Sequence, residues 1–92
     1  MADAYKITFQ KGAIADLKAI DKPTRTRILE RLSLRLALSP RTYGVPLRYE
    51  FAGLYKLRVG DYRVVYVVEG LLVDIVVVGH RRDVYPKLKR RI

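Results

Sequence analysis

The apolar residues near the start of the chain first follow the period of a strand and then the period of a helix. Tyr5, Ile7 and Phe9 alternate with polar residues, as they do on a half-buried strand. From about Lys11 to Ile20 the apolar positions recur at roughly three-residue spacing with charged residues between them. This spacing predicts a short amphipathic helix.

A second, longer helix is predicted over Thr24–Leu38, with an apolar stripe on one side and arginines on the rest. Pro23 suits the first turn of a helix, where its missing N–H is not needed. Either Asp21 or Lys22 would be the N-cap, and the charge of Asp21 suits the positive end of the helix dipole. Ser39–Pro40 should end the helix, because the residue before a proline disfavours helical backbone angles. Two consecutive helices joined by a tight turn predict a helical hairpin.

The second half of the chain is β-prone and follows an irregular stretch over 41–53. Gly60–Asp61 and Glu69–Gly70 are turn signals, and Gly79 should end the last strand. The three predicted strands span residues 54–59, 62–68 and 71–78.

The remaining residues after Gly79 predict little regular structure. We expect a loop or short turn over 80–86 and a basic tail over Lys87–Ile92 with one or two helical turns. The element order is therefore β-α-α-β-β-β. We expect one α+β domain over residues 1–92, in which a helical hairpin packs on one face of a small antiparallel sheet.

The composition narrows the chemistry that this domain can perform. The chain has 92 residues, a formal net charge of +10, no cysteine and one histidine. The absence of cysteine excludes disulfides, thiolate chemistry and zinc fingers, and we expect no metal and no cofactor. No run approaches the roughly 20 apolar residues of a membrane span. We therefore expect a cytoplasmic protein with an anionic partner and no membrane contact.

The Gly60–Asp61 turn predicts how the cations are arranged. If it is a two-residue loop, Arg58 lies opposite Arg63, and Lys56 shares their face because side chains alternate along a strand. Like charges directly opposite each other are destabilising, which favours an anion-binding role for this face. A face of long side chains that simply extend into water explains the same pattern.

Two further residues follow the third strand of this meander. The end of that strand should lie near the start of the middle strand, so Arg81 can join Arg63. Tyr85 follows four residues later. An aromatic ring beside guanidinium groups is a stacking platform for a base, although packing over the sheet edge is the commoner role of a tyrosine.

Two segments of the chain resemble a known family. Leu54–Tyr66 (LYKLRVGDYRVVY) and Val78–Tyr85 (VGHRRDVY) are similar to the RelE toxins of bacterial and archaeal toxin–antitoxin modules. The β-α-α-β-β-β order agrees with the fold of the RelE/ParE superfamily, and the resemblance covers nearly the whole chain. It implies a metal-independent endoribonuclease that enters the ribosomal A site and cuts mRNA by attack of a 2′-hydroxyl on the adjacent phosphate. It also implies three partners: an acidic RelB-like antitoxin, the ribosome and mRNA.

The resemblance implies roles for individual residues. Lys56 matches an active-site lysine, and Arg63 matches the arginine that contacts the scissile phosphate. Arg81 matches the arginine proposed as general acid, although charge stabilisation suits a guanidinium better. Tyr85 matches the tyrosine that stacks on a base. Arg58 stands where the best-known members have a second lysine.

The general base is open between two residues. Neighbouring cations disfavour the ammonium form of Lys56, and His80 is of the type that most often transfers protons. If the Glu69–Gly70 turn is a two-residue loop, His80 lies on the face of Arg63.

Glu50 is the carboxylate nearest the cluster in the sequence, and we expect it to be exposed or ion-paired. Further cations in the loop and tail are expected to bind RNA: Arg82, Lys87, Lys89 and Arg90.

Three other functions remain open at this point. A ParE-like toxin shares the fold but acts on DNA gyrase and lacks the catalytic set. A catalytically inactive member would only bind RNA or an antitoxin, and the arginine at position 58 is compatible with that. A general nucleic-acid-binding domain would explain the charge but not its clustering. The presence of Lys56, Arg63, Arg81 and Tyr85 together favours the RelE-like endoribonuclease.

Overall fold

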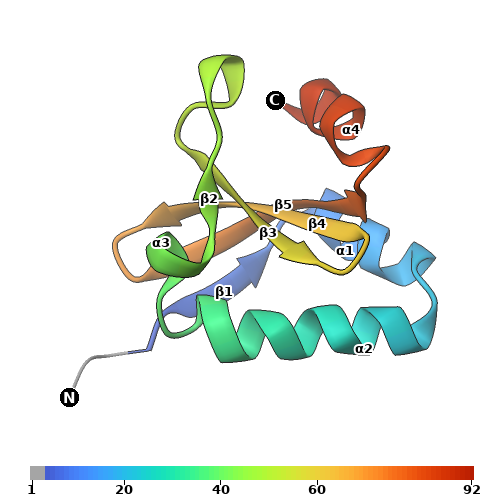
Figure 1. Ribbon diagram of the computed structural model, residues 1–92, viewed down its shortest axis with the longest axis horizontal. Coiled ribbons are helices and arrows are strands. Elements are labelled where there is room, and N and C mark those ends of the chain that lie inside the picture. Colours follow the sequence, from blue (N-terminus) through green and yellow to red (C-terminus); the bar gives the residue numbers. More distant parts are fainter. Residues whose placement is uncertain (1–3) are drawn as a thin grey trace.

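A computed structural model describes residues 4–92, so the first three residues of the expected domain lie outside it. Residues 4–92 form five strands, four α-helices and two short turns of other helical types, and Figure 1 shows their arrangement. In order they are β1 (Lys6–Phe9), α1 (Lys11–Ala19), α2 (Lys22–Arg31), a π-helical turn (Leu32–Leu36), α3 (Pro40–Tyr43), β2 (Val45–Pro46), a 3-10 turn (Tyr49–Phe51), β3 (Leu54–Val59), β4 (Tyr62–Glu69), β5 (Leu72–His80) and α4 (Val84–Arg91).

The strands form a single sheet in the order β1-β5-β4-β3-β2. β3, β4 and β5 make the predicted antiparallel meander, and β2 pairs antiparallel with β3. β1 instead pairs in parallel with β5, over Lys6–Phe9 and Leu72–Ile75. A parallel pair needs a long connection between its strands, and all elements from α1 to β4 lie between these two. The predicted α+β fold is therefore confirmed, with one parallel pair at the β1 edge.

The second helix begins directly after the predicted cap, and its helical path ends two residues before the predicted end at Leu38. The Asp21 carboxylate accepts a hydrogen bond from the Thr24 N–H at 3.1 Å and another from the Thr24 hydroxyl at 2.9 Å. Asp21 is thus the N-cap, and these bonds lower the pKa of its carboxyl group. At its other end α2 widens into the π-helical turn, where the Ala37 N–H donates to the Leu32 carbonyl at 3.1 Å. The helical path ends shortly before Ser39.

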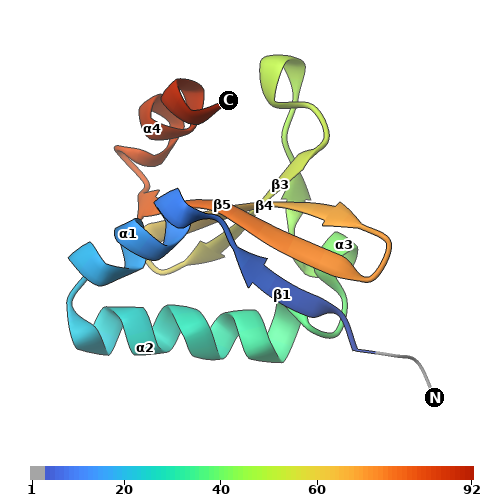
Figure 2. The same cartoon turned by 180° about the vertical axis from the view of Figure 1, so that it is seen from behind.

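The α1–α2 hairpin covers one face of the sheet and forms the larger core (Figure 2). Ile28 and Leu36 are fully buried, and Leu32 is 2% exposed. These three residues occur every four positions, so they share one side of the helix and face the sheet together. Their partners in this core include the sheet residues Leu57, Val59, Val64, Tyr66, Val73, Ile75 and Val78.

The opposite face of the sheet carries a helix, which corrects part of the prediction for the C-terminal residues. The loop expected over 80–86 is shorter than predicted, and the helical turns expected in the tail begin at Val84 and continue to Arg91 as α4. Val84 and Leu88 are fully buried against Val65 and Val77 in a second, smaller core. The helix forms because these four apolar side chains can be removed from water together.

Two other boundaries differ from the predictions. The stretch expected to be irregular contains α3, β2 and the 3-10 turn. β5 continues through Gly79 to His80, because Gly79 pairs with Arg63 and His80 pairs with Tyr62 on β4. Within residues 4–92, no helix is long and apolar enough to span a bilayer.

Candidate active site

Three cations lie on one face of the β3–β4 hairpin, as the turn at Gly60–Asp61 predicts. The register pairs Arg58 with Arg63 and Lys56 with Val65. Alternation along the strands puts Lys56, Arg58 and Arg63 on the same side of the sheet, the side that also carries α4. We call these three residues the cationic face.

The side chain of Arg63 is held by the backbone of the hairpin turn. Its guanidinium donates to the Gly60 carbonyl at 3.1 Å and to the Tyr62 carbonyl at 2.9 Å. Gly60 adopts a φ of 58°, the left-handed conformation that glycine accepts without strain. These bonds hold the Arg63 side chain against the turn.

Arg81 reaches the same turn from the end of β5. Its N–H donates to the Asp61 carbonyl at 2.7 Å, and its Nε lies 3.9 Å from an Asp61 carboxylate oxygen. Both side chains of this ion pair are more than half exposed, so the pair adds little stability. Arg81 and Arg63 are thus anchored at adjacent residues of one turn, as the predicted meander requires.

Tyr85, at the start of α4, lies over the cationic face. The Lys56 Nζ is 5.8 Å from the centroid of the Tyr85 ring. The ring also packs against the second core, so it is partly buried. Tyr85 therefore has the structural role expected of a tyrosine at a sheet edge, and its contact with Lys56 also places it at the predicted cluster.

His80 does not lie on the face of Arg63, which corrects the prediction made from strand alternation. The β4–β5 loop is a two-residue loop, Gly70–Leu71. A β-bulge then inserts Val76 as an extra residue in β5, so Arg63 pairs with Gly79 and His80 moves to the opposite face. There the imidazole packs edge-on against Tyr62, with 5.7 Å between ring centroids. Its Nδ1 accepts a hydrogen bond from the Arg82 N–H at 3.3 Å.

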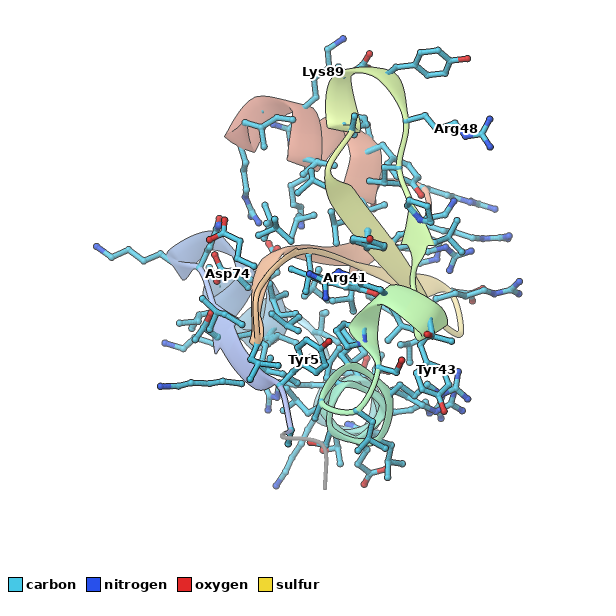
Figure 3. The ribbon with its side chains drawn as sticks, turned by 90° about the vertical axis from the view of Figure 1, so that its left-hand side faces the viewer. Tyr5, Arg41, Tyr43, Arg48, Asp74 and Lys89 are labelled. Carbon is cyan, nitrogen blue, oxygen red and sulfur yellow. The ribbon has the colours of Figure 1, made fainter. Side chains whose placement is uncertain are left out.

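The other predicted RNA-binding cations have different surroundings. The Lys87 Nζ donates to the Asp16 carboxylate at 3.1 Å, so Lys87 is engaged within the protein. Lys89 and Arg90 are exposed on α4, and Arg82 is exposed in the turn before it. Figure 3 shows Lys89 at the outer end of the molecule.

Glu50 lies away from the cationic face. It is exposed in the 3-10 turn at the tip of the β2–β3 connection, and it lines a shallow surface pocket together with Lys89. This agrees with the expectation that Glu50 is exposed or ion-paired.

Among residues 4–92 there is no group of three or more side chains arranged to hold a metal ion.

Sequence reasoning missed the contact that fixes α4. Asp16 is the one buried charged residue in the described part of the chain, at 7% exposure. It accepts two hydrogen bonds from Arg91 at 2.7 Å and one from the Val78 N–H at 2.9 Å. Burial alone would raise the pKa of Asp16, but the bonds from Arg91, Val78 and Lys87 hold it below its ordinary value. The pKa of Arg91 is raised, chiefly by its hydrogen bond with Asp16.

A signal for this contact is present in the sequence. Asp16 follows Ala13 by three residues and precedes Leu17, so it occupies the apolar side of α1. An acid on a buried helix face requires a cation or N–H donors nearby. Which donors supply those bonds depends on the position of α4.

A pocket of about 420 Å³ opens beside the cationic face. Lys56, Arg58 and Arg63 line one part of it, and Arg35 and Tyr43 line another. The sequence offered no specific role for these last two residues.

Comparisons with known proteins agree on one kind of protein. Residues 7–85 match the sequence profile of the ParE toxin of the type II toxin–antitoxin system, parDE. The chain is 31% identical to toxin RelG of Mycobacterium tuberculosis over 83 residues, covering 88% of this chain and 95% of RelG. It is 30% identical to toxin RelE of Mycobacterium tuberculosis over 87 residues, covering 95% of this chain and 81% of that toxin.

The fold agrees with a solved structure of the same kind. It matches a chain of the crystal structure of a RelBE toxin–antitoxin complex from Mycobacterium tuberculosis with a TM-score of 0.82 and 30% identity. The match covers 90% of this chain and 98% of that chain.

Proposed function

The chain belongs to the RelE/ParE superfamily of toxins from type II toxin–antitoxin systems, and we propose that it is a ribosome-dependent endoribonuclease that cuts mRNA in the A site. The observation that carries this proposal is the cationic face. Lys56, Arg58 and Arg63 share one side of the sheet, Arg81 meets Arg63 at the hairpin turn, and Tyr85 lies beside Lys56.

The proposed reaction uses the RNA itself as nucleophile. The 2′-oxygen forms a bond to the adjacent phosphorus while the bond from phosphorus to the 5′-oxygen breaks. The products are a 2′,3′-cyclic phosphate and a 5′-hydroxyl. One proton leaves the 2′-hydroxyl for the general base, and solvent water supplies the proton that the departing 5′-oxygen gains, so the reaction requires no redox partner.

The cations lower the energy of the transition state. Negative charge builds on the phosphorane oxygens, and cations already held in place stabilise it without rearranging at the moment of reaction. Arg63 suits this role because two backbone carbonyls orient its guanidinium. Arg81 stabilises the charge that develops at the leaving oxygen, since a guanidinium does not readily give up a proton.

The base and the stacking ring are assigned to Lys56 and Tyr85. Arg58 cannot accept a proton, and His80 packs on the opposite face, so Lys56 is the side chain of the cluster suited to take the 2′-proton. The Tyr85 ring stacks on a base and holds the attacking nucleotide against the cations.

We also infer a cognate antitoxin with an acidic, RelB-like binding segment. The solved Mycobacterium tuberculosis relative is a toxin–antitoxin complex. The net charge of +10 favours an acidic partner. It also favours binding to ribosomal RNA and mRNA with an affinity that falls as the salt concentration rises. Three exposed cations outside the cluster contribute to this RNA binding: Arg82, Lys89 and Arg90.

A ParE-like action on DNA gyrase is the second candidate, because the matching family profile is that of the ParE toxin. A translating lysate separates the two. The endoribonuclease predicts mRNA cuts within ribosome-bound codons, with 5′-hydroxyl ends, and no cuts in free RNA. Intact mRNA with accumulating cleaved DNA–gyrase complexes would support the second candidate. If the protein produced neither cut mRNA nor cleaved DNA–gyrase complexes, it would be a module that only binds RNA or an antitoxin.

Variants test the residue assignment in the same lysate. Arg63→Ala and Arg81→Ala should abolish mRNA cleavage and growth arrest while the circular dichroism spectrum stays unchanged. Arg27→Ala is the matched control, because Arg27 is an exposed arginine of α2 outside the cluster. Undiminished cleavage by both site variants would contradict the assignment.

A further inference from the structure

The pocket beside the cationic face lies at an unpaired part of the sheet edge. β2 pairs with β3 through only two residues, Val45 opposite Lys56 and Pro46 opposite Tyr55. On the N-terminal side of Val45 the chain belongs to α3, so no strand within residues 4–92 pairs with the outer edge of β3 from Leu57 onward. The pocket of about 420 Å³ opens there.

Two residues from outside the sheet complete this pocket. Arg35 comes from the π-helical turn after α2, and Tyr43 comes from the end of α3. The Arg35 guanidinium carbon lies 5.6 Å from the centroid of the Tyr43 ring. Single π-helical turns are rare and occur often at functional sites. Figure 3 shows Tyr43 directed away from the molecule on the side of β2 and β3, opposite the side on which Asp74 lies.

The position of Tyr43 is set by buried contacts rather than by the pocket. The Tyr66 hydroxyl, in the core, donates to the Pro40 carbonyl at 2.7 Å and anchors α3. Gly44 follows Tyr43 and packs so closely on Tyr66 that a Cβ atom at this position would collide with the Tyr66 hydroxyl. The Tyr43 ring is therefore presented by a fixed segment, which reduces the entropy lost on binding.

The lining of the pocket is suited to a nucleotide. Four side chains, from Arg35, Lys56, Arg58 and Arg63, carry positive charge, and no carboxylate of residues 4–92 lines the pocket. Tyr43 is 47% exposed and Val45 is 54% exposed, so a planar group can reach an apolar surface there. A guanidinium next to an accessible aromatic ring fits a base and its phosphate together. A carboxylate-bearing peptide would pair with the four cations but would leave the Tyr43 ring without a stacking partner.

We propose that Arg35 and Tyr43 form a second nucleotide subsite, which holds an RNA residue neighbouring the one that stacks on Tyr85. Tyr43 stacks on the base, and Arg35 and Arg58 contact its phosphate. Lys56 joins the two subsites, because it lines this pocket and also lies 5.8 Å from the centre of the Tyr85 ring. This inference rests on the proposed endoribonuclease function and assigns the path of the RNA beyond the scissile phosphate.

Cleavage of ribosome-bound mRNA under single-turnover conditions tests the subsite. Tyr43→Ala and Arg35→Gln should each raise the concentration for half-maximal rate by about tenfold, within the range expected for losing a stacked base, while the saturated rate stays nearly constant. Tyr43→Phe keeps the ring and should behave like wild type. Arg27→Gln removes an exposed arginine of α2 outside the pocket and is the charge-matched control.

A binding experiment separates failure of the subsite from failure of the proposed function. Fluorescence anisotropy with a labelled 12-nucleotide single-stranded RNA requires no ribosome and no catalysis. Tyr43→Ala and Arg35→Gln should raise the Kd about tenfold relative to Arg27→Gln, even if the wild type cuts no mRNA. Unchanged Kd values for both variants would overturn the subsite. Normal RNA binding and cleavage with weakened binding of the cognate antitoxin would overturn it in favour of an acidic protein partner.

Discussion

The Asp16 carboxylate binds the Arg91 guanidinium through two hydrogen bonds of 2.7 Å that join α1 to α4 across 75 residues of sequence. Lys87 adds a third bond to the same carboxylate at 3.1 Å, and the Val78 N–H of β5 adds a fourth at 2.9 Å. Three elements therefore meet at one side chain. Because α4 also carries Tyr85, this contact helps to fix where the Tyr85 ring lies beside Lys56.

Replacing Asp16 should destabilise the protein. Asp16→Asn leaves Arg91 and Lys87 without their anionic partner, and we expect the free energy of unfolding to fall by about 2–4 kcal/mol. Equilibrium unfolding in urea measures this change. Glu30→Gln, at an exposed position on α2, is the matched control and should change stability by less than about 0.5 kcal/mol. A similar stability for both variants would contradict an anchoring role for Asp16.

The same contact predicts acid sensitivity. The pKa of Asp16 is lowered in the folded protein from an ordinary value of 3.8. The folded state therefore binds a proton at this site less readily than the unfolded state, and the stabilisation is fully present above about pH 4. It is lost as the pH falls through the lower folded pKa. Unfolding measured from pH 6 to pH 2 should show the advantage of wild type over Asp16→Asn shrinking below pH 4, whereas a constant difference would exclude this linkage.

The contact between Tyr66 and Gly44 predicts a pair of coupled substitutions. Tyr66→Phe removes the hydrogen bond to the Pro40 carbonyl and should cost about 1 kcal/mol. Gly44→Ala places a methyl group against the Tyr66 hydroxyl and should cost about 1–3 kcal/mol. The double variant should lose less than the sum, because removing the hydroxyl relieves part of the collision. Strict additivity in urea unfolding would show that the two side chains do not interact.

The assignment of the general base gives a kinetic prediction. Lys56→Arg keeps the positive charge but removes a group able to accept the 2′-proton, so the rate of mRNA cleavage should fall by about 100-fold or more. His80→Phe keeps the edge contact with Tyr62 and should leave the rate within about twofold, since His80 lies on the other face. Single-turnover cleavage on ribosomes provides both rates, and the reverse order would transfer the base to His80.

Local signals in the sequence predict the central hairpin correctly. The residues of β3 alternate, Gly60–Asp61 closes a two-residue loop, and together they set the register that pairs Arg58 with Arg63. The Asp21 cap and the apolar stripe of α2 are local features of the same kind. Each depends on residues within a few positions of one another, so a pattern in the sequence is sufficient to reveal it.

The face of His80 was not predictable in this way. Alternation puts His80 with Arg63, but one inserted residue in β5 reverses every side chain after it. The bulge has no turn residue to mark it, since Val76 lies in a run of valines. Its position depends on how β5 fits against β4 and under α4, which no local pattern contains.

By itself, the sequence determined the helical hairpin, the antiparallel meander and the grouping of Lys56, Arg58 and Arg63 on one face. The tertiary structure decided that α4 packs on the same side of the sheet as these cations, that Asp16 anchors α4 through Arg91, and that Arg35 and Tyr43 border the cationic face. The reason is physical. Periodicity and turn geometry arise from neighbouring residues, whereas a buried ion pair or a pocket at a sheet edge requires segments far apart in the chain to meet, and only the folded chain brings them together.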